Sequence, residues 1–138
     1  MRLIKPRFSS RMEGFSVPFF GFLLGILVFL AIYGVEPLRV TGSGWIFQGV
    51  IESDILQHYA GWMFFRDSPW TWPLGLALNM GYPYGANISY TDSIPIVSIF
   101  FKAISAWLPE HFQFFGLYTL LSFALQGAAA ALLLRLFT

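Results

Sequence analysis

Two long apolar runs lie toward opposite ends of the chain. Residues 15–35 contain no charged side chain, and as a helix they would extend about 31 Å, close to the hydrocarbon thickness of a bilayer. Residues 112–137 form the second run, in which Arg135 is the only charged residue. The pattern predicts a transmembrane helix in each run.

The first run follows a basic segment, residues 1–14, which carries four Lys or Arg residues and one acid, Glu13. A secretory signal peptide shares this pattern, but its apolar region is usually shorter, and residues 34–37 lack a small-x-small cleavage site. We therefore predict that the first helix is retained. Its basic flank favours a cytoplasmic N-terminus.

Residues 36–92 carry more acidic than basic side chains, which suits a loop on the external side of the membrane. Within this loop the pattern predicts a helix from about residue 45 to residue 66. Asp67-Ser68-Pro69 would end it, because the residue before a proline avoids helical geometry. A short helix from Leu74 to Met80 is also expected.

Residues 93–108 are apolar except for Lys102 and are short for a complete membrane crossing. Two topologies follow. If the segment spans, the chain has three transmembrane helices, and this is the interpretation that we favour. If it is re-entrant or interfacial, the chain crosses twice and Arg135 returns to the cytoplasmic side.

Composition agrees with the hydropathy pattern, since 57% of the residues are hydrophobic and 11% are charged. Soluble domains carry about 25% charged residues. We therefore predict an all-α membrane protein in contact with the lipid bilayer. The chain has no Cys, which excludes disulfides and thiolate chemistry. No basic patch lies beyond the N-terminal segment, so nucleic-acid binding is not expected.

Polar side chains converge on one face of the predicted loop helix. At about 100° per residue, Asp54, Gln57, His58 and Gly61 fall within an arc of roughly 100°. Asp54 and His58 are four residues apart and can reach one ion or one substrate group. The carboxylate could act as a general base or ligate a divalent cation. From spacing alone, a structural Asp–His contact is the more common explanation.

Asp92 and Lys102 are the other candidates. Asp92 could cap the helix that follows it, as could Ser93, or could supply a second carboxylate to an external cavity. Lys102 lies within an apolar segment, where a charge is often functional. It could bind an anionic lipid phosphate or extend its ammonium group to the interface.

Two stretches, residues 53–62 (SDILQHYAGW) and 87–95 (NISYTDSIP), resemble a group of bacterial polytopic membrane proteins with the architecture of the GT-C glycosyltransferase superfamily. The resemblance implies that the chain is the N-terminal fragment of a GT-C-like fold in the bacterial inner membrane. It also implies a polyprenyl-phosphate-linked sugar donor on the external face. Asp54 would be the catalytic base and Asp92 a second acid.

The same resemblance implies that Gln57, His58 and Lys102 bind substrate. A divalent cation, Mg²⁺ or Mn²⁺, would be held by Asp54 and His58 if it is used at all. The family's usual adjacent acidic pair is absent, because Ile55 follows Asp54.

The function expected from the sequence is therefore that of the N-terminal part of a membrane glycosyltransferase, with the fragment inactive alone. The alternative is a non-enzymatic protein, either a transporter component or an assembly factor for surface polysaccharide. Further spans followed by an external domain would favour the transferase, and inverted repeats of broken helices would favour a transporter.

Overall fold

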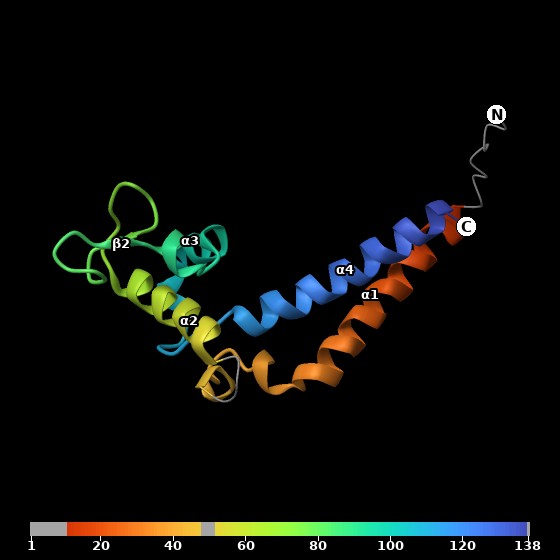
Figure 1. The fold of residues 1–138 in the computed structure, drawn as a ribbon, viewed down its shortest axis with the longest axis horizontal. Helices are drawn as coiled ribbons and strands as arrows, with labels where there is room; N and C mark the ends of the chain where they lie inside the picture. Colours follow the sequence, from red (N-terminus) through yellow and green to blue (C-terminus); the bar gives the residue numbers. More distant parts are fainter. Residues whose placement is uncertain (1–10, 48–51, 138) are drawn as a thin grey trace. The chain divides into compact units, whose positions relative to one another are not determined.

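The computed structural model describes residues 11–47 and 52–137, which divide into two compact units (Figure 1). Unit 1 comprises Met1–Val35 and Gly116–Thr138, and unit 2 comprises Glu36–Phe115. Most described residues are helical, and the strands among them form one pair of two residues each. The predicted all-α fold class is confirmed.

Unit 1 consists of two long apolar helices, α1 (Arg11–Tyr33) and α4 (Phe115–Phe137). Phe15–Tyr33 and Phe115–Phe137 have 19 and 23 residues, which correspond to about 28 and 34 Å of helix and lie within the range of about 17–25 residues typical of transmembrane helices. Their large apolar side chains are mostly exposed, including Leu24, Leu27 and Leu134. By length and composition both helices suit a membrane, and their exposed apolar surface supports a membrane location.

Glycines bring α1 and α4 close together (Figure 1). A Cβ atom on Gly25 would overlap the backbone carbonyl of Phe123, and one on Gly21 would overlap that of Gly127. Advancing along α1 corresponds to moving backward along α4, so the two helices pack antiparallel. Small residues permit this approach in membrane helix pairs. The ring of Phe29 lies 6.0 Å from that of Phe123 and extends the same contact.

A glycine also ends α1. Gly34 has φ +68°, in the left-handed region that glycine enters without steric cost. Its amide still donates to the carbonyl of Leu30 at 3.0 Å, as the last bond of the helix. The helix therefore stops at Tyr33, two residues before the predicted end at Val35.

Unit 2 is built around one central helix, α2 (Glu52–Asp67). Its other elements are short 3-10 helices, one strand pair and one short α-helix. They are, in chain order, η1 (Glu36–Leu38), η2 (Gly44–Phe47), β1 (Leu76–Ala77), β2 (Ala86–Asn87), η3 (Ile88–Thr91), α3 (Pro95–Ala103) and η4 (Ser105–Trp107). β1 and β2 are antiparallel, with Leu76 opposite Asn87 and Ala77 opposite Ala86.

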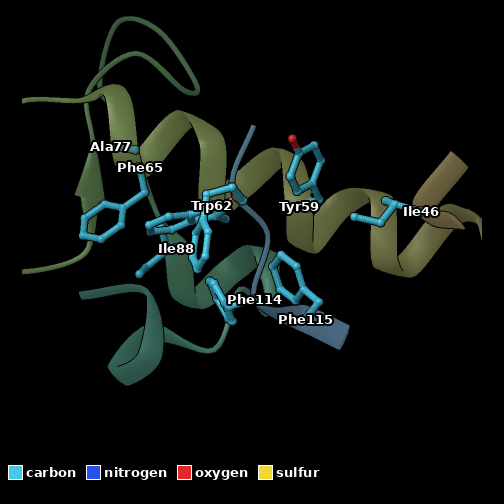
Figure 2. Packing of buried hydrophobic residues seen from close by; sticks show 9 residues of the cluster. Ile46, Tyr59, Trp62, Phe65, Ala77, Ile88, Phe114 and Phe115 are labelled. Atoms are coloured by element: carbon cyan, nitrogen blue, oxygen red, sulfur yellow. Dashed lines mark hydrogen bonds between the residues drawn. The ribbon is translucent and has the colours of Figure 1, made fainter. Parts of the chain in front are cut away.

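Aromatic side chains from α2 and from the end of the unit form the core of unit 2 (Figure 2). Trp62 and Phe65 on α2, and Phe114 near the end of the unit, are each at most 1% exposed. The rings of Trp62 and Phe114 meet edge to face with centroids 5.4 Å apart. Such pairs contribute about 0.5–1.5 kcal/mol beyond their buried area. The core therefore depends on contacts between residues about fifty positions apart in the chain.

Residues 93–108, the segment favoured as a third transmembrane helix, do not form one helix long enough to cross a bilayer. Within residues 93–108 the α-helix is limited to α3, whose nine residues extend only about 13.5 Å. Ser98 and Lys102, on this helix, are buried against protein, and their polar groups bond to protein carbonyls. The described residues contain two helices that are long and apolar enough to cross a membrane, which corresponds to the alternative topology.

Other boundaries also differ from the prediction. Within the loop helix predicted from about residue 45 to residue 66, residues 44–47 form the 3-10 helix η2, and α2 is Glu52–Asp67. Residues 48–51 and 1–10 lie outside the described residues. The predicted loop 36–92 belongs to a folded unit that continues to Phe115. The second apolar helix was predicted to start at residue 112, but α4 starts at Phe115. The side chains of Phe112 and Phe114 lie in the core instead, and the backbone N–H of Gln113 donates to the carbonyl oxygen of Val40.

We predict that Gly25→Ile separates α1 from α4, because the new side chain would occupy the space of the Phe123 backbone. Leu24→Ile is the matched control, since Leu24 is 59% exposed. Spin labels on cysteines introduced at Leu27 and Leu125, both exposed, would report the distance between the helices. The distance distribution should lengthen and broaden only in Gly25→Ile. An unchanged distribution would contradict the packing described above.

Candidate functional site

The polar face of α2 contacts the turn formed by residues 90–93. Gln57 Nε2 donates to the Tyr90 carbonyl oxygen at 3.4 Å, and His58 Nδ1 lies 2.8 Å from the Thr91 carbonyl oxygen. In return, Ser93 Oγ donates to the His58 carbonyl oxygen at 2.7 Å. The structure therefore brings together the two stretches of sequence that carry the candidate residues.

The contact to Thr91 indicates which ring nitrogen of His58 carries a hydrogen atom. A carbonyl oxygen can only accept a hydrogen bond, so Nδ1 must carry the proton. In the neutral ring, Nε2 then keeps a lone pair and can act as a base or a ligand. The ring also stacks on Phe115, with centroids 6.4 Å apart. His58 is thus held in one orientation by a hydrogen bond and a ring contact.

Gly61 lies at the centre of this contact and is buried. A Cβ atom there would overlap Thr91 Oγ1 and would lie 2.5 Å from Ser93 Oγ. The two hydroxyl groups bond to each other at 2.7 Å. Gly61 was predicted to lie on the candidate polar face. The turn of residues 90–93 packs against Gly61, so this part of the face is covered.

Asp92 occupies the same turn but not as a helix cap for α3. Its backbone is left-handed, with φ +49°, and it ends η3. The residue at the N-cap of α3 is Ile94, also left-handed, without a side-chain cap bond. The predicted capping role of Asp92 is therefore wrong. Its side chain is exposed, which leaves the second-acid role as a prediction.

Asp54 lies on α2 one turn before Gln57 and His58, on the same face, and it is exposed. Among residues 11–47 and 52–137 no group of three or more His, Asp or Glu side chains is arranged to hold a metal ion. Asp54 and His58 alone do not make a complete ligand set for Mg²⁺ or Mn²⁺. The donor set of the described chain does not fit a bound cation.

Lys102 lies apart from this face and is 4% exposed. Its ammonium group donates to the carbonyl oxygens of Phe65, Ser68 and Pro69 at 2.5, 2.7 and 3.5 Å. It also lies 4.1 Å from the centre of the Phe65 ring. Burial lowers the pKa of Lys102, and the carboxylate of Asp67 partly opposes this shift.

These contacts place a cation at the C-terminus of α2, where unpaired carbonyls and the helix dipole favour positive charge. All three ammonium protons have acceptors. The predicted role of Lys102 in binding a lipid phosphate stays a prediction, and its contacts indicate a structural role.

Three further side chains, none of them among the candidate site residues, hold unit 2 together. Arg66 donates to the carbonyls of Pro109 and Glu110 at 2.7 and 2.8 Å. Gln113 donates to that of Pro37 at 2.7 Å. Trp62 donates to the carbonyl of Phe112 at 2.9 Å. The position of Arg66 at the C-terminus of a helix can be recognised from the sequence. Its partners, Pro109 and Glu110, lie more than forty residues away and cannot be identified from the sequence.

Comparison with known proteins gives one match. The family model described as a domain of unknown function (DUF6311) matches residues 22–138. No curated protein and no solved structure matches the chain.

We predict that Gly61→Ala displaces the turn at residues 90–93, because its Cβ would overlap Thr91 Oγ1. Gly44→Ala is the control, since a Cβ at Gly44 meets nothing within 4 Å. Hydrogen exchange at the amides of residues 91–93 should accelerate in Gly61→Ala and not in the control. Equal exchange in the two variants would mean that the turn does not depend on this contact.

We predict that Lys102→Met lowers the free energy of unfolding of unit 2 by about 2–4 kcal/mol, because buried carbonyl oxygens lose their donor. Arg39→Met is the control. Arg39 is exposed and pairs only at the surface, with Glu36 at 3.3 Å, and such pairs contribute at most about 1 kcal/mol. Thermal unfolding followed by Trp fluorescence reports on unit 2, because all 5 Trp residues lie there. Equal losses in both variants would argue against the role assigned to Lys102.

Proposed function

The chain belongs to the family of the domain of unknown function DUF6311, whose description assigns no activity, so we propose a function from the residues themselves. The proposal is the N-terminal part of an integral membrane glycosyltransferase that transfers a sugar from a polyprenyl phosphate on the external face. The observation that carries it is the contact between residues 53–62 and 87–95. These are the two stretches that resemble bacterial polytopic membrane proteins with GT-C architecture, and Gln57 and His58 join them through the carbonyls of Tyr90 and Thr91.

In this proposal Asp54 is the general base. Its carboxylate removes the proton of the acceptor hydroxyl while the hydroxyl oxygen attacks the anomeric carbon of the sugar. The bond between that carbon and the phosphate oxygen breaks, and the polyprenyl phosphate leaves with the electron pair. No metal is needed to balance the step.

Gln57 and His58 have positioning roles. Each has one hydrogen bond to the 90–93 turn, and the second nitrogen of His58 can accept a proton or hydrogen bond from the sugar or acceptor. Asp92, in the same turn, is the proposed second acid. The interaction of Lys102 with a lipid phosphate is the least supported element, because its ammonium donates to protein carbonyls.

The proposed topology is a multi-pass protein of the bacterial inner membrane, with the N-terminus in the cytoplasm. Two crossings, by α1 and α4, would return the chain to the cytoplasmic side. Arg135, in the last turn of α4, would then lie on the same side as the basic N-terminal segment, in agreement with the positive-inside rule. Unit 2, between the two helices, would be external.

A transfer assay tests the proposal. The full-length protein in membranes is supplied with radiolabelled sugars on polyprenyl phosphate. Asp54→Asn should lower the rate by at least about 100-fold, the usual contribution of a general base. Asp67→Asn, at the other end of α2, is the matched control and should retain activity.

Transfer by Asp54→Asn at the wild-type rate would remove Asp54 from the mechanism. Absence of transfer by the wild-type protein with every donor would instead favour the non-enzymatic alternative, a transporter component or an assembly factor. Unchanged Trp fluorescence in both variants would show that unit 2 remains folded.

A further inference from the structure

Helix α3 buries two polar side chains and exposes two large apolar ones. Ser98 and Lys102 point inward and are 0% and 4% exposed. Ile96 and Phe100 are 84% and 60% exposed. At about 100° per residue, Ile96 and Phe100 lie within about 40° of each other, and Ser98 lies about 200° from Ile96. A helix on the surface of a water-soluble domain has the opposite arrangement.

Two further exposed apolar residues follow Phe100 in the sequence. Ala103 lies on the same side as Ile96 and Phe100, at a spacing of three residues from Phe100, and it is exposed. Trp107, in η4, is 82% exposed. We call Ile96, Phe100, Ala103 and Trp107 the α3 apolar face. It carries no charged group, because Lys102, the only charge on α3, is turned inward.

The segment of sequence that contains this face is also poor in charge. From Ser68 to Pro109 the sequence contains two charged residues, Asp92 and Lys102. The exposed side chains of this segment include large aromatic residues, among them Trp72, Tyr82, Tyr84 and Tyr90. Trp and Tyr concentrate at the boundary between lipid and water, where the ring is apolar and its polar atom is hydrated.

We propose that the α3 apolar face is a bilayer-binding surface, on which α3 lies in the plane of the membrane interface. Its occupant is the acyl and headgroup region of lipid. A helix bonds the backbone polar groups of its middle turns internally. The groups of its end turns can bond to water or lipid headgroups when the helix lies at the interface. A protein partner would be expected to meet a polar rim with hydrogen-bonding groups, whereas the indole N–H of Trp107 is the only hydrogen-bonding side-chain group among these four residues.

The connectivity of the chain supports a lipid occupant. Unit 2 begins at Glu36, three residues after α1 ends, and α4 begins at its last residue, Phe115. Both ends of the unit are therefore joined to helices that suit a bilayer. An in-plane helix with an apolar face and an interfacial Trp is a known way to attach such a unit to the membrane surface. The inference does not depend on the proposed glycosyltransferase activity.

Fluorescence quenching tests the proposal on the complete 138-residue chain in vesicles of phosphatidylethanolamine and phosphatidylglycerol. The chain contains no Cys, so an environment-sensitive label can be placed on a single cysteine at Ile96 or Phe100. Labels at Ser89 and Glu110, which are exposed and polar, are the controls. Labels at Ile96 and Phe100 should be quenched by nitroxide lipids and should show several-fold weaker iodide quenching than the controls.

Two outcomes would overturn the proposal. Iodide quenching at Ile96 and Phe100 equal to that of the controls would show that the face is in water. Shielding from both iodide and nitroxide lipid would show that protein, such as a second copy of the chain, covers it.

A second measurement avoids the label. Trp107→Phe, at an exposed position, should lower the fraction of Trp emission that brominated lipids quench, with the far-UV circular dichroism unchanged. An unchanged quenched fraction would also overturn the proposal.

Discussion

The carbonyl oxygens of irregular backbone segments need hydrogen-bond donors when they are buried. In unit 2, a few long polar side chains supply these donors and so hold the segments together. A buried carbonyl without a donor costs about 1–3 kcal/mol. Lys102 supplies donors to the end of α2, and Arg66 supplies them to residues 105–110. Gln113 does so for Pro37 and Arg39. Long polar side chains thus join segments that regular secondary structure does not connect.

The same principle applies at the candidate site. Gln57 and His58 donate to two consecutive carbonyls of the turn that bears Asp92, and Gly61 provides the space for that turn. The polar residues of α2 are therefore explained in part by structure alone. A catalytic role for Asp54 and for Nε2 of His58 is compatible with these structural hydrogen bonds, because the bonds use neither group.

The sequence predicted the elements whose signal is local. The apolar runs 15–35 and 112–137 correspond to α1 and α4, and the end of α2 at Asp67 agrees with the Pro69 signal. Contacts between distant parts of the chain were not predicted. Lys102 in an apolar run resembled a membrane charge, whereas its partners are carbonyls more than thirty residues earlier. The short helix expected at Leu74–Met80 is replaced by β1, whose partner β2 lies nine residues further along.

The account depends most on the contact between the polar face of α2 and the 90–93 turn, and the protonation of His58 tests it most directly. Nitrogen-15 NMR distinguishes the two neutral tautomers of histidine, and the chain has only 2 His residues, so His111→Gln assigns the signals. The account predicts that neutral His58 carries its proton on Nδ1, with a coupling across the hydrogen bond to Thr91. A proton on Nε2, with Nδ1 unprotonated, would contradict it.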